Sequence, residues 1–491
     1  MPQSKVDWVR VPTLKTPDNF RKYAASLGLN LPCDDKIQTA PGSPLSSPVE
    51  GVSINGKKIG NRFAVQPMEG WDGTRTGGLT DEVLRRWTRF GQSGAKLICG
   101  GEAMAVRPDG RANPNQLIIQ EENKADLARL RDTLLGAHRQ IYGTADDLVI
   151  GFQLTHSGRF CRPNDKRLES RVAWRHPSLD RKFQVTGDAQ VFTDAQIHGL
   201  IGDYVKAARI AWDVGADFVD IKHCHGYLLH DFLGAFTRPG EFGGPFENRT
   251  RILREIVEGI RAGGNKIEIG VRLSAFDTVP FKPDPSRAEA GKLGPGIPDD
   301  FPVPYTYGFG VNQQNPLEHD LAETQQFAQL CARLGIKILN ITAGSPYYCP
   351  HVQRPAAYPP SDGYQPPRDP LIEVARQIDA TRQVKMKAPR GLVIIGSAYS
   401  YLQEFLPAVA QAVVRQRWAD MIGLGRMILS YPTLPADTLE KGALNAKSVC
   451  RTFSDCTTAP RNGMISGCYP LDKFYATKPE AEKVKALKKT L

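Results

Sequence analysis

The chain has 491 residues, enough for one large domain or for two or three ordinary ones. Its net charge of +11, from 63 basic and 52 acidic residues, suits anionic ligands, but the basic residues are dispersed and no nucleic-acid-binding signature appears. No apolar run approaches the roughly 18–20 residues that cross a bilayer, and the N-terminus lacks a signal peptide's apolar segment. Nine thinly spread cysteines do not indicate a disulfide framework. We therefore expect a cytoplasmic protein that binds neither membranes nor nucleic acid.

Short apolar segments alternate with amphipathic ones along most of the chain. The predicted strands cover residues 58–68, 95–106, 148–156, 216–222, 266–275, 336–343, 391–398 and 419–427. The predicted helices cover residues 80–93, 123–142, 193–215, 249–262, 318–334, 370–381 and 402–417. Thr193 and Gln196 make a capping box, and Gly215 ends that helix. Eight strand–helix units predict an α/β fold, a closed (β/α)8 barrel rather than a doubly wound sheet.

Three stretches lie outside this repeat. Residues 1–50 are rich in Pro and Ser, and we expect them to wrap the floor of a barrel that spans residues 51–444. Residues 278–316 are a Pro/Gly-rich insertion after the fifth strand, interpreted either as a lid or as an assembly arm. Residues 445–491 form a tail with three cysteines and a lysine-rich end that predicts a solvated helix.

Active-site residues of such barrels lie where the strands end. The candidates at the first, second and third strand ends are Pro67, Met68, Glu69, Trp71, Ala103 and Gln153. Those on the fourth and fifth strands are Lys222, His223, His225, Tyr227 and Arg272, and the last two strands end in Gly396, Ser397, Gly425 and Arg426.

Two features of this set indicate a phosphate-bearing ring system. Small residues at the last two strand ends expose backbone N–H groups that, with Arg426, suit a phosphate. Arg272 is either an ion-pair partner inside the barrel or a residue whose planar guanidinium group faces an electron-rich ring. The Gln153 amide, which can both donate and accept hydrogen bonds, suits the edge of a pyrimidine. Together they describe a flavin mononucleotide (FMN) site.

The run "DIKHCHGYLLHDFLG" places three histidines and a tyrosine at the end of the fourth strand. A metal site, a proton relay and a histidine-rich loop all fit this composition. Because no other strand end offers matching ligands, we predict no metal here.

The segments "NRFAVQPM", "GGEAMAV", "FQLTHSGR", "HGYLLHDFL", "FGGPFENRTR", "VRLSA" and "GLGRMI", between residue 60 and about residue 430, occur in the order of a known family. The chain resembles the Old Yellow Enzyme family of FMN-dependent ene-reductases, which includes the 2,4-dienoyl-CoA reductase barrels. The resemblance implies an FMN-binding barrel in which NADPH or NADH reduces the flavin. The flavin then reduces an activated C=C bond of a small molecule.

The resemblance also assigns roles to single residues. Tyr227 matches the family's proton donor, and His225 matches one of two residues that hydrogen-bond the substrate oxygen. The other position, usually His, falls on Lys222, unless a one-residue shift brings in His223. Trp71 is expected to line the substrate pocket.

Glu69 stands where the family often has Thr or Cys beside the flavin. A carboxylate there would repel a reduced, anionic flavin. It is therefore expected to be protonated, to turn away or to lower the flavin's potential.

The dienoyl-CoA reductase-like relatives hold an iron–sulfur cluster with four cysteines, and the tail keeps only part of that pattern. Cys456 and Cys468 match, Val449 and Thr452 occupy the first two positions, and Cys450 is one residue out of place. We therefore predict no cluster.

Two other hypotheses remain beside NAD(P)H-driven C=C reduction. One is FMN-dependent oxidation or dealkylation of an amine or another small substrate on the same barrel. The other is a barrel that binds flavin or phosphate without turnover. The sequence is compatible with a homo-oligomer and does not identify the substrate.

Overall fold

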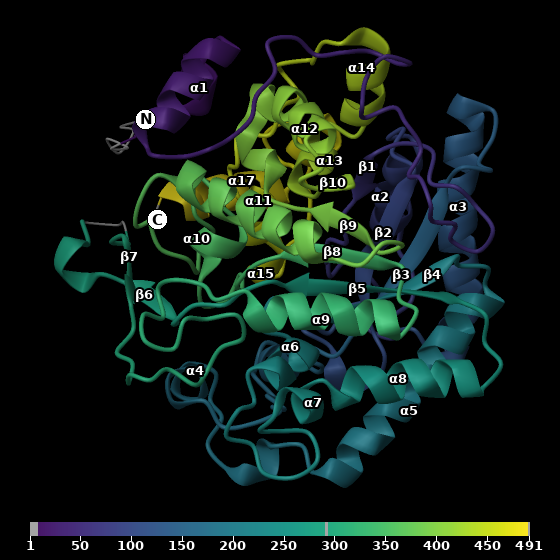
Figure 1. Cartoon of the computed structure of the whole chain (residues 1–491). Helices are drawn as coiled ribbons and strands as arrows, with labels where there is room; N and C mark the ends of the chain where they lie inside the picture. Colours follow the sequence, from purple (N-terminus) through teal and green to yellow (C-terminus); the bar gives the residue numbers. More distant parts are fainter. Residues whose placement is uncertain (1–7, 290–292, 490–491) are drawn as a thin grey trace.

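The computed structural model of the chain describes residues 8–289 and 293–489, and its centre is a closed parallel barrel (Figure 1). In barrel order the strands are β1 (Phe63–Val65), β10 (Met421–Leu424), β9 (Val393–Gly396), β8 (Ile338–Thr342), β5 (Glu268–Ser274), β4 (Phe218–His223), β3 (Val149–Thr155) and β2 (Leu97–Ala105). Each strand overlaps one of the eight predicted segments. The predicted (β/α)8 barrel is confirmed.

Long helices connect the strands and surround the barrel (Figure 1). They are α2 (Asp81–Gly91), α3 (Lys124–Tyr142), α5 (Asp194–Asp213), α8 (Arg251–Ala262), α9 (Ala322–Arg333), α11 (Pro370–Lys387) and α12 (Leu406–Arg415). The predicted capping box forms at the start of α5, where Thr193 and Gln196 each accept a backbone N–H of the other. The helix α12 begins later than predicted because a 3₁₀ segment, Tyr399–Phe405, precedes it.

Shorter elements complete the described chain. They are the helices α1 (Pro17–Ser26), α4 (Pro177–Lys182), α6 (Leu228–Leu233), α7 (Phe246–Arg249), α10 (Pro350–Gln353), α13 (Arg426–Ser430), α14 (Leu434–Lys441), α15 (Asp455–Arg461), α16 (Lys473–Ala476) and α17 (Glu480–Lys489), and the antiparallel pair β6 (Phe281–Pro283) and β7 (Gly296–Pro298).

The floor of the barrel is closed by residues 49–59. Val49, Ile54 and Ile59 are buried against the first residues of the strands, including Val149 and Phe218. The helix α1 packs at a different place, where Phe20 stacks on Phe405 at a ring-centre distance of 4.7 Å. The apolar side chains that close the barrel floor therefore lie at the border between the predicted N-terminal extension, residues 1–50, and the barrel.

The insertion and the tail both pack against the barrel. In the insertion, Val279, Phe281, Tyr305 and Val311 form a small core with Tyr364. None of the described residues of 278–316 lines the pocket treated below. In the tail, Ala481 and Val484 of α17 are buried with Tyr469 and Tyr475, so one face of the predicted solvated helix is packed.

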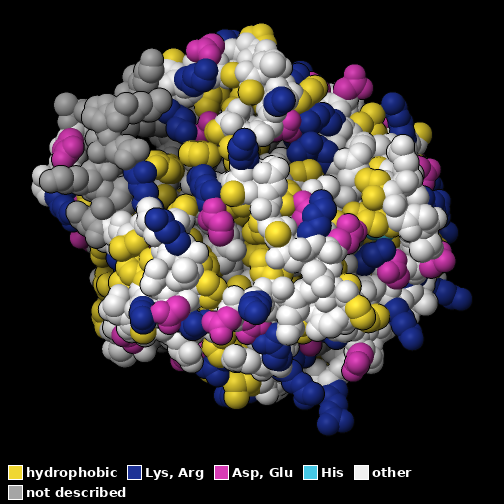
Figure 2. All heavy atoms as spheres, turned by 90° about the horizontal axis from the view of Figure 1, so that it is seen from above, with side chains coloured by type: hydrophobic (Ala, Val, Ile, Leu, Met, Phe, Trp, Pro, Cys, Tyr) yellow, Lys and Arg dark blue, Asp and Glu magenta, His cyan; other side chains and the backbone are white. Residues whose placement is uncertain are grey.

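Surface charge is mixed on the face that Figure 2 shows, where Lys and Arg side chains lie among Asp and Glu without a continuous basic band. Within residues 8–289 and 293–489, no helix combines the length and apolarity that a bilayer span requires.

Candidate functional site

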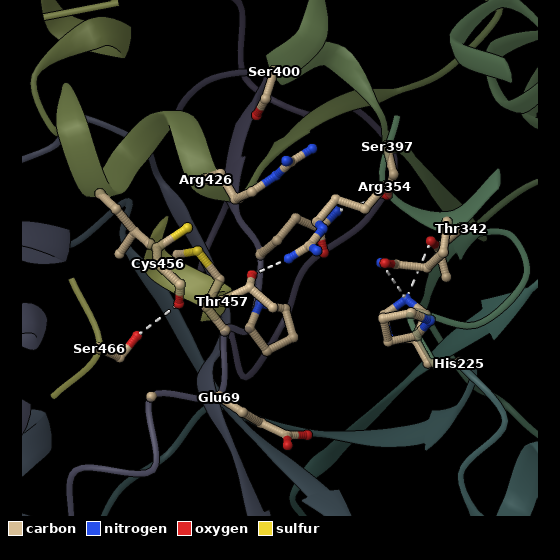
Figure 3. A pocket seen from close by; sticks show the side chains of 18 of the residues that line it. Glu69, His225, Thr342, Arg354, Ser397, Ser400, Arg426, Cys456, Thr457 and Ser466 are labelled. Carbon is tan, nitrogen blue, oxygen red and sulfur yellow. Dashed lines mark hydrogen bonds between the residues drawn. The ribbon is translucent and has the colours of Figure 1, made fainter. Parts of the chain in front are cut away.

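A pocket opens where the barrel strands end, and most of the predicted site residues line it (Figure 3). The predicted residues found there are Pro67, Met68, Glu69, Trp71, Lys222, His225, Tyr227, Arg272, Ser397, Gly425 and Arg426. They come from β1, β4, β5, β9 and β10, or from the residues directly after these strands. The fold therefore brings together side chains that are up to about 360 positions apart in the sequence.

Four predicted residues do not line this pocket. Ala103 and Gln153 are register partners on β2 and β3, and the Gln153 amide donates to Asp220 at 2.7 Å in the barrel interior. Gly396 ends β9 without facing the cavity. His223 is buried on the outer face of β4, where its ring lies 5.6 Å from that of Phe327 on α9.

The position of His223 follows from the two-residue period of a strand. Phe218 packs inside the barrel floor, and Asp220 and Lys222 follow it at intervals of two, so all three side chains point inward. His223 is out of phase and points to the helix layer. Lys222, not His223, therefore faces the pocket.

Glu69 is the hub of the polar network in the pocket. Its Oε1 pairs with the ammonium of Lys222, and its Oε2 accepts hydrogen bonds from the Tyr227 hydroxyl at 2.8 Å and the Trp71 indole at 3.0 Å. The Glu69 side chain lines the pocket and is paired with Lys222, so the expectation that it turns away is wrong. Its protonation and its effect on the flavin's potential stay predictions. The charges of Glu69 and Lys222 therefore compensate each other inside the pocket.

Tyr227 is held by its surroundings on every side. It lies at the N-terminus of α6, and the residue is only 3% exposed. The Lys222 ammonium lies 3.4 Å from the ring centre, and the Tyr347 hydroxyl is 3.0 Å from the Tyr227 hydroxyl. Burial, then the charge of Glu69, raises the pKa of Tyr227 well above its ordinary value.

His225 takes a left-handed backbone conformation, with φ of 66°, which turns its ring into the pocket. Its Nε2 contacts the Thr342 hydroxyl at 3.3 Å and the Gln353 amide at 3.2 Å. Burial, followed by the neighbouring charges of Arg272 and Lys222, holds the pKa of His225 well below its usual range. The imidazole is therefore neutral, with one nitrogen that donates a hydrogen bond and one that accepts.

The end of the pocket near β9 and β10 is rich in guanidinium groups (Figure 3). Arg426 donates to the Pro355 carbonyl at 3.0 Å, but its Nη1 is buried without a partner. Arg354 binds the Thr457 hydroxyl, and its Nε and Nη2 are buried without partners. Burial and the charge of Arg426 lower the pKa of Arg354 to about 9.

The sequence-based prediction missed a group of residues that the tail and the segment after β8 add to the pocket. They are Tyr347, Gln353, Arg354, Cys456, Thr457, Pro460, Arg461 and Ser466. Tyr347 follows β8 and could have been found by the strand-end rule. Arg461 and its neighbours lie in a tail without strand–helix periodicity, so no sequence signal pointed to them.

An ion triad anchors the tail to the barrel. The buried Arg86 guanidinium pairs with both Glu102 and Asp72, and Asp72 also accepts the backbone N–H of Ser466 at 2.9 Å. This contact explains how residues near the end of the chain become part of a pocket at the mouth of the barrel.

All nine cysteines are free thiols. Among the described residues, no group of three or more His, Cys, Asp or Glu side chains is arranged to hold a metal ion. The absence of an iron–sulfur cluster stays a prediction.

Comparison with known proteins agrees with this architecture. Residues 49–292 match the NADH:flavin oxidoreductase / NADH oxidase family. An NADH:flavin oxidoreductase of Gibberella zeae is 27% identical over 62% of this chain and 68% of its own length. An NADPH dehydrogenase of Clostridium acetobutylicum is 30% identical over 46% of this chain and 64% of its own length. The chain thus matches about two thirds of the length of these relatives.

The fold is also found among solved structures. The Old Yellow Enzyme homologue from Zymomonas mobilis superimposes with a TM-score of 0.53 at 20% identity, covering 82% of this chain and 94% of that one. The class defined by fold and site is a flavin-type (β/α)8 barrel. Residues 49–292, about half of the chain, belong to the NADH:flavin oxidoreductase / NADH oxidase family, and the fold is that of the Old Yellow Enzyme homologue.

The residues present fit FMN, the cofactor that this family implies. Unpartnered guanidinium N–H groups of Arg426 and Arg354 lie at one end of the pocket, and they are the donors that a phosphate accepts from. A Cβ added to Gly425 would meet no atom closer than 3.9 Å, so the backbone there leaves open space. The Arg272 Nε is also buried without a partner.

Proposed function

We propose that this protein is an FMN-dependent oxidoreductase that uses NADPH or NADH to reduce an activated C=C bond, such as that of an α,β-unsaturated carbonyl compound. The observation that supports it most directly is the convergence of Tyr227, His225 and Lys222 in one pocket with Arg272. A proton donor, two oxygen-binding groups and a central cation are the parts that this reaction needs.

Several residues would hold the cofactor. Arg426, Arg354 and the backbone at Ser397 and Gly425 would bind the phosphate, and Arg272 would face the ring. FMN bound in this way supplies the hydride chemistry, taking a hydride from the nicotinamide and passing one to the substrate.

The substrate oxygen would be bound by His225 and Lys222. The neutral His225 imidazole donates one N–H, and the Lys222 ammonium keeps N–H groups that Glu69 does not use. Both contacts stabilise the negative charge that develops on the oxygen. Tyr227 then protonates the carbon that does not receive the hydride.

Separate measurement of the two half-reactions tests this proposal. In the FMN-loaded protein, Tyr227→Phe should leave flavin reduction by NADPH within about twofold of wild type and slow reoxidation by cyclohexenone by about 100-fold or more. Tyr358→Phe, which removes a phenol outside the pocket, is the matched control. Unchanged reoxidation in Tyr227→Phe would contradict the assignment.

The hydrogen bond from Tyr227 to Glu69 supports a second candidate, oxidation of an amine or alcohol. In that direction a substrate proton would pass to Tyr227 while Tyr227 gives its own proton to the Glu69 carboxylate. Anaerobic bleaching of the flavin by such a substrate, without a nicotinamide, would distinguish this activity.

A further inference from the structure

The proton donor Tyr227 has a second phenol beside it. Tyr347 follows β8, and its hydroxyl lies 3.0 Å from the Tyr227 hydroxyl. Its ring stacks on Phe160 at 4.0 Å, and Phe160 also contacts the Tyr227 ring edge-on at 5.6 Å. The Lys182 ammonium donates to the Tyr347 carbonyl at 2.8 Å. The packing therefore fixes both hydroxyl groups with respect to each other.

The direction of the hydrogen bond between the two hydroxyls can be worked out. A phenol has a single hydrogen, and Tyr227 donates it to Glu69 at 2.8 Å because a carboxylate paired with Lys222 is an acceptor. The hydrogen atom between the two hydroxyl groups must then belong to Tyr347. Tyr347 therefore donates to Tyr227, the orientation needed to pass a proton to it.

Arg461, the last residue of α15 in the tail, provides a cation beside Tyr347. Its guanidinium carbon lies 5.1 Å from the centre of the Tyr347 ring. Its position is fixed by Asp362 and by the Pro346 carbonyl, to which it donates at 3.2 Å. The Asp362 side chain is half exposed, so water screens its charge, whereas Arg461 lines the pocket.

The two phenols have different charged neighbours. Burial, then the charge of Glu69, raises the pKa of Tyr347 to about 12, and the nearby Arg461 acts in the opposite direction. Burial, then the charge of Glu69, also raises the pKa of Tyr227 well above its ordinary value. Proton transfer from Tyr347 to a Tyr227 phenolate moves the negative charge away from the Glu69 carboxylate, which contacts Tyr227, and toward the Arg461 guanidinium, which faces the Tyr347 ring.

We propose that Tyr347 reprotonates Tyr227 during turnover and that Arg461, supplied by the tail, stabilises the charge left on Tyr347. The proposal rests on the function proposed above for Tyr227. As the Tyr227 O–H bond breaks and a C–H bond forms on the substrate, the Tyr347 O–H bond breaks and a new O–H bond forms on Tyr227. The negative charge moves to Tyr347, whose ring faces the Arg461 guanidinium, and a solvent proton restores Tyr347.

Rapid-mixing experiments on the FMN-loaded protein test the relay. Tyr347→Phe should slow reoxidation by cyclohexenone by about tenfold or more while flavin reduction by NADPH stays within about twofold of wild type. In mixtures of light and heavy water, the wild-type rate should show a curved dependence, because two protons move, and Tyr347→Phe a linear one. The matched control is Tyr358→Phe, which should keep the curved dependence.

The Arg461→Met variant tests whether Arg461 affects the reaction through Tyr347 or only supports the folded structure. Because Arg461 acts through Tyr347, the substitution should slow reoxidation in the wild-type background and add no further loss to Tyr347→Phe. Additive losses, or wild-type rates and isotope dependence in Tyr347→Phe, would overturn the relay while leaving the role of Tyr227 intact. Failure of the wild-type protein to reduce cyclohexenone would instead reject the proposed function, and the relay with it.

Discussion

Lys222 of β4 and Glu69, which follows β1, form an ion pair inside the pocket, with side chains only 4% and 11% exposed. Each residue alone departs from the family pattern that the sequence resembles. Together they bring no net charge to the pocket, and they position Tyr227 from two sides, through a hydrogen bond and through a cation–π contact. The pair therefore acts on Tyr227 as one unit.

The first prediction concerns the energetic coupling of this pair. Lys222→Met should lower the free energy of unfolding by about 3 kcal/mol, because it leaves the Glu69 carboxylate buried without its cation. The double variant Lys222→Met/Glu69→Gln should recover most of this loss, since both charges are gone. Denaturant unfolding of wild type, both single variants and the double variant measures the coupling. Additive losses would show that the two residues act independently.

The second prediction concerns the flavin. Glu69→Gln removes one negative charge from the pocket and leaves Lys222 without a counter-charge. A reduced, anionic flavin should then be stabilised, which raises the midpoint potential of bound FMN by on the order of tens of millivolts. Spectroelectrochemical titration measures this shift. Arg209→Met, an exposed substitution on α5, should leave the potential unchanged, and an unchanged potential in Glu69→Gln would contradict the prediction.

The third prediction is a pH dependence from Asp220, which lies below the pocket and receives the Gln153 amide. Burial raises the pKa of this carboxyl to about 6, above its value in the unfolded chain. The folded protein therefore keeps this proton up to a higher pH than the unfolded chain does. As a result, Asp220 lowers the free energy of unfolding increasingly as pH rises from about 4 to 6. Asp220→Asn should increase the free energy of unfolding, by about 1 kcal/mol more at pH 8 than at pH 5. Equal gains at both pH values would exclude this cause.

Much of this architecture could be predicted from the sequence because the barrel is built from local patterns. Each strand is a short apolar run, and each long helix carries a capping residue or an amphipathic stripe, as at Thr193. The rule that chemistry lies at strand ends then found Tyr227, His225 and Arg272. Whether Lys222 or His223 faces the pocket depends on which alternate residues of β4 point into the barrel. The structure shows this through Asp220, which points inward and accepts the Gln153 amide.

The rest of the site could not be predicted because long-range contacts assemble it. Arg354 lies in a Pro-rich segment and Arg461 in the tail, and neither belongs to a periodic element of the barrel. The tail that carries Arg461 is held by the triad of Arg86, Glu102 and Asp72, whose contact with Ser466 joins positions 394 residues apart. Arg354 contacts the same tail through Thr457. No spacing rule in the sequence encodes such a contact.

The last prediction concerns the two guanidinium groups at the proposed phosphate end of the pocket. Burial, followed by the positive charge of the neighbouring Arg426, lowers the pKa of Arg354 to about 9. Arg354→Met should therefore stabilise the FMN-free protein by about 1 kcal/mol and weaken FMN binding by about 10- to 100-fold. These effects have opposite signs, so a general loss of structure cannot produce both. Denaturant unfolding of the FMN-free protein measures the first effect, and the fluorescence of released FMN measures the second.

Arg426→Met should weaken FMN binding in the same way, and Arg209→Met, the same change on the exposed surface of α5, should alter neither quantity. Wild-type affinity for FMN in both pocket variants would show that the phosphate binds elsewhere. The unpartnered N–H groups of Arg354 and Arg426 would then need a different anion, because buried guanidinium groups without acceptors are costly to the folded state.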